Sequence, residues 1–207
     1  MSNIAPNPPT SFQPSSRRPR IYHTAFVHPL AAVIGDVEIG PEVMVAPGAS
    51  IRADEGGPFF IGGRSNVQDG VVIRALETFG PHSEKNTVEV GGLRYAVYVG
   101  ERVSLSPQAM LQGPCLVEED SFIGAQALVF RSRVGCGSVV EPCSRLVGVI
   151  VPPERYVPAG SCLSNQAEAD RLPRIDERYQ FRAQNAEAVR VNTELVRAYL
   201  GQRQGRI

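Results

Sequence analysis

Aliphatic residues recur along this chain with a spacing of six positions. The positions fall in three series, broken by a Gly/Pro-rich stretch and by a longer insertion: Val27, Val33, Ile39, Val45 and Ile51; Ile61, Val67 and Ile73; and Val99, Leu105, Leu111, Val117, Ile123 and Val129. Shifted by one residue, the spacing continues at Val134, Val140 and Leu146, and Val151 and Val157 close it. Such a period is typical of a solenoid in which three six-residue repeats complete one triangular coil. The sequence therefore predicts an all-β fold, a left-handed parallel β-helix with the aliphatic side chains inside.

Two further positions of each repeat fit this fold. The fourth residue after each aliphatic is usually small or branched, as expected where a coil turns tightly: Val37, Val43, Ala49, Val71, Val103, Ala109, Cys115, Ser121 and Ala127. Glycine commonly follows the aliphatic, at Gly40, Gly62, Gly100, Gly124 and Gly135. Because glycine tolerates a positive φ angle, we expect these glycines to occupy corners with that conformation.

A β-sandwich with short strands is the competing fold. It would show apolar and polar residues alternating with period two, and strands spaced by 8–12 residues. Neither pattern is present, so the β-helix is favoured.

Segments outside the repeat divide the chain into three parts. We expect a disordered Pro/Ser/Arg-rich leader over 1–20, the β-helix over 21–163 with a loop extruded at about 77–96, and a helical segment over 164–207 that packs on the β-helix. Asn165–Leu172 reads as a short helix stopped by Pro173, and a longer helix is expected from Asp176, as its N-cap, to about Leu200. Its apolar positions could pack along the solenoid; they are Val189, Val191, Leu195, Val196, Tyr199 and Leu200.

Composition narrows the choice of partners. The 21 basic and 21 acidic residues give zero formal charge, so nothing indicates a nucleic-acid partner. The four cysteines (Cys115, Cys136, Cys143 and Cys162) have no CxxC spacing and are expected to be reduced thiols. No apolar run reaches the length of a membrane span, and the first twenty residues resemble no signal peptide. We therefore expect a soluble, cytoplasmic protein.

Three stretches resemble the γ-class carbonic anhydrases closely. They are Ala46–Asp54 (APGASIRAD), Ser65–Ile73 (SNVQDGVVI) and Val103–Pro114 (VSLSPQAMLQGP). The resemblance extends over roughly residues 25–200 and includes Gln166–Leu172 and Val191–Asn192. It implies a homotrimer with a zinc-type ion at each subunit interface, bound by two histidines of one subunit and one of its neighbour. In that family a metal-bound water ionises near neutral pH and attacks carbon dioxide.

Several polar positions of that family are retained. The resemblance implies that Arg52, Asp54 and Asp69 pair across the subunit interface, since an Arg–carboxylate fork is geometrically specific. It also implies that Gln68 orients the metal-bound hydroxide beside Asn66. Glu55 matches the carboxylate assigned to proton transfer, and Asn192 matches a polar residue near the site.

The three metal-binding histidines are absent at the matching positions, which hold Arg74, Pro107 and Gln112. A tyrosine near the family's site is matched by Arg190. Proline offers no donor atom, a glutamine amide is a poor zinc ligand, and a guanidinium keeps its positive charge. At 4 Å that charge would repel each unit of metal charge by about 4 kcal/mol at moderate dielectric. We therefore expect no metal at the usual place.

The remaining histidines do not restore a zinc site. His23 and His28 belong to the opening coil, and His82 to the extruded loop. Two interpretations of Arg74 stay open. In one it fills the vacated volume and pairs with Asp69 or with a bound anion such as bicarbonate, and in the other it points into solvent between subunits.

Three functions are compatible with this pattern. The first is a catalytically inactive, trimeric scaffold or anion-binding homologue that has protein partners, as in carboxysome-like assemblies. The second is an active carbonic anhydrase with a metal site rebuilt from Cys115, His82 or a carboxylate, although Cys115 falls on the small-residue interior positions. The third is a hexapeptide acyltransferase, for which only His82 could serve as general base.

Overall fold

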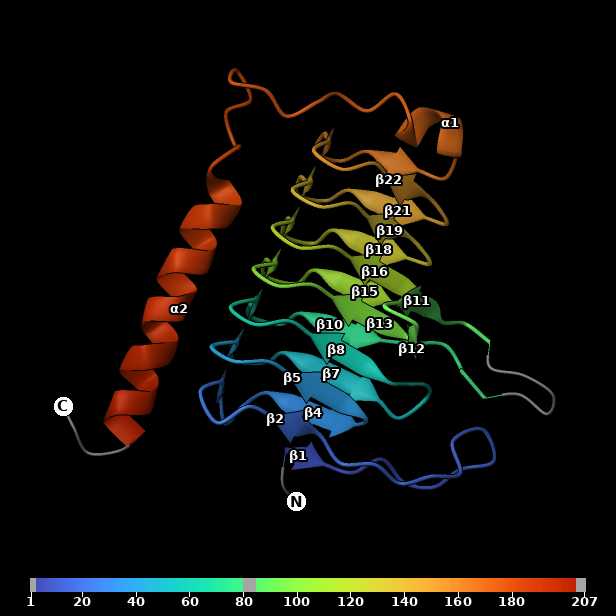
Figure 1. The fold of residues 1–207 in the computed structure, drawn as a ribbon, viewed down its shortest axis with the longest axis vertical. Coiled ribbons are helices and arrows are strands. Elements are labelled where there is room, and N and C mark those ends of the chain that lie inside the picture. Colours follow the sequence, from blue (N-terminus) through green and yellow to red (C-terminus); the bar gives the residue numbers. More distant parts are fainter. Residues whose placement is uncertain (1–2, 80–84, 204–207) are drawn as a thin grey trace.

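The computed structural model describes residues 3–79 and 85–203, which form a parallel β-helix with three faces (Figure 1). The first sheet has eight strands in the order β1 (Ile4–Ala5), β4 (Ala32–Gly35), β7 (Ser50–Ala53), β10 (Val72–Arg74), β15 (Met110–Gln112), β18 (Leu128–Phe130), β21 (Arg145–Val147) and β24 (Cys162–Leu163). The second has seven: β2 (Arg20–Ile21), β5 (Val37–Ile39), β8 (Phe59–Ile61), β13 (Val97–Val99), β16 (Cys115–Val117), β19 (Arg133–Val134) and β22 (Ile150–Val151). The third also has seven: β3 (Phe26–Val27), β6 (Met44–Val45), β9 (Asn66–Val67), β14 (Ser104–Leu105), β17 (Phe122–Ile123), β20 (Val139–Val140) and β23 (Tyr156–Val157). The predicted parallel solenoid is confirmed.

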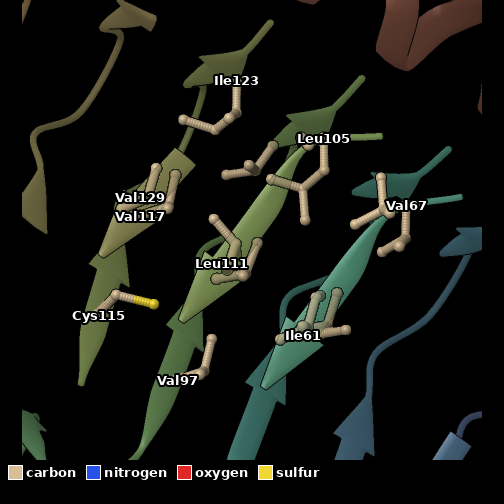
Figure 2. Packing of buried hydrophobic residues seen from close by; sticks show 14 of the residues in the cluster. Ile61, Val67, Val97, Leu105, Leu111, Cys115, Val117, Ile123 and Val129 are labelled. Carbon is tan, nitrogen blue, oxygen red and sulfur yellow. The ribbon is translucent and has the colours of Figure 1, made fainter. Parts of the chain in front are cut away.

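The six-residue aliphatics form the interior of the coils. In the third sheet Val67, Leu105 and Ile123 are in register on successive strands, and all three are fully buried. Figure 2 shows these side chains pointing into the space between the sheets, together with the thiol of Cys115. Stacking like residues on successive coils buries every aliphatic against its counterparts above and below, which is why one repeated pattern suffices to build the core.

The glycines that follow the aliphatic residues are required for a different reason from the one expected. None of the five has a positive φ angle. A Cβ on Gly62 would lie 2.5 Å from the backbone carbon of Gly100, and one on Gly100 would lie 2.6 Å from the nitrogen of Glu119. These glycines are therefore required because successive coils approach too closely for a side chain.

The positive φ angles fall instead on turn residues three positions after the aliphatic, whether or not a glycine stands between them. Arg64, Arg102 and Asp120 have φ angles of 58°, 53° and 58°. The turns that carry them are stacked, because the amide of Arg102 donates to the oxygen of Gly63 (3.0 Å) and the amide of Asp120 to that of Glu101 (3.1 Å).

The insertion between β10 and β13 carries an antiparallel hairpin. Its strands are β11 (Val88–Val90) and β12 (Leu93–Tyr95), which lie beside the coils in Figure 1. The coils keep their register around it, since β10 still pairs with β15 and β8 with β13.

Residues 3–20, expected from the sequence to be a disordered leader, make defined contacts with one another and with the first coil. Strand β1 extends the first sheet in parallel with β4. Asn7 is buried, donates from Nδ2 to the oxygen of Ser15 (3.0 Å) and accepts from the amide of Arg17 (2.8 Å). The segment covers the first coil, whose backbone edge and interior would otherwise face water.

The C-terminal segment contains two helices, of which the longer begins later than expected. Helix α1 (Gln166–Ala169) is capped by Asn165. Helix α2 (Gln184–Arg203) starts at Gln184 rather than after Asp176. Asp176 instead accepts from the amide of Arg178 (2.9 Å), which closes a turn. Tyr179 stacks on Tyr156 at 4.2 Å, so burial of this ring holds 177–183 in turns against the last coils.

Helix α2 runs back along the third sheet, from the last coils towards the first (Figure 1). Val196 is fully buried against Phe26 and Met44, and Tyr199 stacks on Phe26 at 4.6 Å. Val191 and Leu195, also expected as packing positions, are exposed. No helix within residues 3–79 and 85–203 combines the length and the apolar character needed to cross a membrane.

Candidate functional site

Three of the singled-out side chains form a row on the outside of the first sheet. Arg74 of β10 is in register with Arg52 of β7 on one side and with Gln112 of β15 on the other. Each follows a buried aliphatic (Ile51, Ile73 or Leu111) by one position. Because side chains alternate between the two faces of a strand, the aliphatic points inwards and the polar residue outwards. We call Arg52, Arg74 and Gln112 the polar row.

Both guanidinium groups of the polar row have a carboxylate partner in the same chain. Arg74 Nη2 pairs with Oε1 of Glu55, and Arg52 Nη2 lies 2.6 Å from Oδ2 of Asp54. Within the described chain Arg74 therefore pairs with Glu55, and no ion pair joins it to Asp69, the partner considered from the sequence. Side chains of Arg74 and Glu55 are each 38% exposed, so this pair contributes about 0–1 kcal/mol and can exchange for another anion.

The amide positions beside the row belong to a buried polar network. Gln68 Nε2 donates to Oδ1 of Asn66 (2.8 Å), and Asn66 Nδ2 donates to Oγ of Ser104 (2.9 Å). Asn66 and Ser104 are in register on β9 and β14, beneath α2. Sequence reasoning missed Ser104, although its place in the repeat, matching that of Asn66, would have revealed it. The network fixes the orientation of Gln68.

The remaining family-matched positions are not brought together in one chain. Pro107 is exposed at the turn before β15, whereas Gln112 ends that strand, so they lie at opposite edges of one face. Asp69 is exposed on the matching turn of the previous coil. Its backbone carbonyl accepts from the amide of Gln108 (2.9 Å), so the two turns are stacked. Arg74, Gln112 and Pro107 can therefore meet only if a second copy of the chain contributes one edge.

The helix-borne candidates make contacts within α2. Asn192 Nδ2 donates to the carbonyl of Ala188 (2.9 Å), and Arg190 lies 3.6 Å from Glu194 one turn further on. In the described part of the chain no hydrogen bond joins Asn192 to Gln68. Helix α2 nevertheless packs on β9, the strand that carries Asn66.

The other candidate metal ligands that lie within the described residues do not form a metal site. His23 is exposed beside Tyr22, and His28 accepts from the amide of Leu30 (3.1 Å). His82 lies outside the described residues. Burial raises the pKa of the Cys115 thiol to about 12, and a metal ligand must be a thiolate. Among the described residues, no group of three or more His, Cys, Asp or Glu side chains could hold a metal ion.

A zinc ion of the family type therefore does not fit the residues at the matching positions. The guanidinium of Arg74 is cationic and already paired with a carboxylate. Gln112 offers only a neutral amide, and Pro107 offers no donor atom. We derive no chemical step through a metal at this place.

Comparison with known proteins identifies relatives that cover most of the chain. The chain is 51% identical to a carbonic anhydrase of Methanosarcina thermophila over 201 residues, which cover 96% of this chain and 81% of that protein. It is 45% identical over 168 residues to the carboxysome assembly protein CcmM of Nostoc sp.. That match covers 81% of this chain but only 29% of CcmM. No protein-family model matches the chain.

Solved structures share the fold at low sequence identity. A putative acetyltransferase from Bacillus cereus superposes with a TM-score of 0.71 and 20% identity, over 96% of this chain and 98% of that one. A hexapeptide transferase family protein from Anaplasma phagocytophilum gives a TM-score of 0.69 and 22% identity, over 88% and 93% of the two chains. At this identity the likeness concerns the hexapeptide-repeat β-helix alone.

Proposed function

Because the chain belongs to the γ-class carbonic anhydrase family, we propose that it is a member that does not hydrate CO₂ with zinc and instead binds small anions as a homotrimer. The pairing of Arg74 with Glu55 carries this proposal. In the family's reaction a dication lowers the pKa of a bound water to about 7. A guanidinium supplies positive charge at the same strand position but cannot accept a lone pair from water. The hydroxide nucleophile would therefore not form there.

The polar row has the donors that a carboxylate-like anion needs. Arg52 and Arg74 are neighbours across one pair of strands, and Gln112 adds an amide on the next strand. Guanidinium groups bind planar oxyanions through two parallel hydrogen bonds. Bicarbonate has this geometry, and it would displace Glu55 or Asp54 from weak, partly exposed ion pairs. Bicarbonate is the anion we expect in this row.

A scaffold role rests on the likeness to part of a larger protein. The Nostoc relative is described as a carboxysome assembly protein, and this chain spans less than a third of it. A trimer of this chain would present three copies of each surface to protein partners, which favours assembly through multivalency. On this proposal the protein works in the cytoplasm or in a carboxysome-like assembly.

The test measures metal content and CO₂ hydration on the same purified protein. After dialysis we expect less than stoichiometric zinc and no hydration that EDTA abolishes. The triple variant Arg74→His, Pro107→His, Gln112→His is the matched gain-of-function control, because it changes only the three ligand positions. It should bind about one zinc per chain and gain EDTA-sensitive hydration.

Two results would contradict the proposal. EDTA-sensitive turnover by the unmodified protein would show that it is an active carbonic anhydrase with a rebuilt metal site, the alternative favoured by retention of Glu55 and Gln68. Failure of the folded triple variant to bind zinc would show that these three positions do not converge. An acyltransferase activity is supported only by the shared fold, and we do not propose it.

A further inference from the structure

A groove of about 850 Å³ runs between helix α2 and the edge of the solenoid. We call it the arginine groove. Its solenoid wall is made by the stacked turns between the second and third sheets, and its other wall by α2; the charged residues that the argument uses are Arg64, Arg102, Asp120, Arg182, Arg190 and Arg197. The volume lies within the usual range for a small-molecule site, about 300–1,000 Å³.

The two walls place cationic side chains at regular intervals. Arg64 and Arg102 occupy equivalent positions in turns of successive coils, joined by the backbone bond from the amide of Arg102 to the oxygen of Gly63. On the other wall, Arg182 lies just before the start of α2, and Arg190 and Arg197 lie on the helix. From Arg190 to Arg197 is two helical turns, about 10 Å, so both guanidinium groups can reach the same groove.

Positive charge exceeds negative charge in the lining. Five arginines line the groove against two acidic residues, Asp120 and Glu194. Arg102 is held by Asp120 (Nη2–Oδ2 at 2.8 Å) and by Glu101 (Nη1–Oε2 at 3.0 Å), which also lies 4.0 Å from Arg64. Arg197 is held by Glu42, with Nη2–Oε1 at 2.7 Å. Arg182 has no ion-pair or hydrogen-bond partner for its guanidinium within residues 3–79 and 85–203.

Most of these ion pairs are exposed and can be exchanged. The side chain of Arg190 is 65% exposed, that of its partner Glu194 is 78% exposed, and their atoms are 3.6 Å apart. Exposed pairs of this kind contribute little to stability. A ligand with two negative charges and bidentate geometry can therefore compete for Arg190 as well as for Arg182.

The helix wall also contains two polar residues with unused hydrogen-bonding atoms. Asn185 and Thr193 are 7% and 9% exposed. Asn185 Nδ2 donates to the carbonyl of Arg102 (2.8 Å), but its Oδ1 has no partner in the described structure, and neither has Oγ1 of Thr193. Leaving a buried polar atom without a hydrogen-bond partner is unfavourable. A hydroxyl-bearing ligand that enters between the flexible arginine side chains can form hydrogen bonds with Oδ1 of Asn185 and Oγ1 of Thr193.

We propose that the arginine groove binds a small phosphate monoester. The phosphate dianion pairs with Arg182 and Arg190, and the hydroxylated part of the ligand lies towards Asn185 and Thr193. This site is separate from the polar row, which is on the outer face of the first sheet. The groove is larger than bicarbonate requires, and the two guanidinium groups that pair with the dianion, those of Arg182 and Arg190, both come from the α2 side of the groove.

Calorimetric titration with glycerol 3-phosphate at physiological salt tests the proposal, with glycerol as the uncharged probe. We expect saturable binding of glycerol 3-phosphate by the unmodified protein and none of glycerol. The double variant Arg182→Gln, Arg190→Gln should bind about tenfold more weakly or worse. The matched control is Arg133→Gln, Arg145→Gln, which removes two exposed arginines on β19 and β21, and it should bind as the unmodified protein does.

A third variant, Arg74→Gln, separates the two anion sites, and it should keep its affinity for glycerol 3-phosphate. Loss of binding in Arg74→Gln with retention in the groove variant would overturn the proposal, because the phosphate would then occupy the polar row. Equal weakening in the groove and control variants would also overturn it, by showing non-specific attraction to charge. So would the absence of saturable binding by the unmodified protein. Circular dichroism confirms that each variant is folded.

Discussion

At the scale of single residues, one position along a strand separates the core from the site. Ile73 is fully buried, and Arg74 beside it faces outwards in the polar row; Leu111 and Gln112 repeat this arrangement on the next coil. A substitution at residue 74 or 112 therefore changes the surface chemistry and leaves the interior stack intact. This separation explains how the ligand positions can change completely while the repeat that builds the fold persists.

The buried thiol of Cys115 makes stability depend on pH. Burial raises its pKa from 9.0 to about 12 in the folded chain, so the folded protein keeps the neutral thiol where the unfolded chain loses its proton. This contribution is fully present below pH 9 and is lost as pH rises from 9 towards 12. Between pH 9 and 10 the free energy of unfolding should fall, with a slope of at most about 1.4 kcal/mol per pH unit from this group.

Denaturant titrations at several pH values check this prediction. The variant Cys115→Ala removes the group and should show a shallower slope in this window, whatever its overall stability. Cys162→Ala is the matched control, since that thiol is exposed, and it should keep the original slope. Identical slopes for the unmodified protein and Cys115→Ala would contradict the assignment.

At the scale of elements, helix α2 is attached to the solenoid by few apolar contacts. Val196 is its fully buried aliphatic residue, packed with Phe26 and Met44, whereas Val191 and Leu195 are exposed. The sequence predicted a helix here but not its start, because Tyr179 and Asp176 make tertiary contacts that no helical periodicity reveals. Much of the remaining face of α2 is polar and borders the arginine groove.

Substitution of Val196 should weaken the packing of α2 on the solenoid. Val196→Ala removes two buried methyl groups and leaves a cavity, so the free energy of unfolding should fall by about 1–2 kcal/mol. Val191→Ala is the matched control on the same helix and should change it by less than about 0.5 kcal/mol. Both are compared at one protein concentration, since association shifts apparent stability. Equal effects would contradict the packing described for α2.

At the scale of the whole molecule, the six-residue repeat predicts the architecture but not its ends. The period of six and the residue types sufficed to predict the parallel coils and the burial of the aliphatic side chains. Three features depend on contacts between distant residues and could not be predicted: the added strand β1, the pairing of Arg74 with Glu55, and the steric reason for Gly62. The position of the candidate site was predicted from the family resemblance. Its chemistry was predicted from the donor atoms that the residues at the matching positions lack.

The proposed homotrimer predicts the mass of the protein in solution. With 22.4 kDa per chain, sedimentation equilibrium should give about 67 kDa, three times that mass. On this proposal Arg52 lies at the subunit interface, so Arg52→Ala should shift the protein towards smaller species. Arg133→Ala, on the second sheet, is the control. A sedimenting species of one chain mass for the unmodified protein would contradict the trimer.

The hairpin of β11 and β12 shows that the solenoid can accept additional chain between coils. Strands β10 and β13 occupy neighbouring faces and keep their partners on both sides, so the backbone leaves and re-enters the stack at a fixed opening. Doubling the length of a flexible insertion costs only about 0.6 kcal/mol. This opening is thus a ready-made attachment point, where a longer segment or a foreign module can be grafted without disturbing the repeat beneath it.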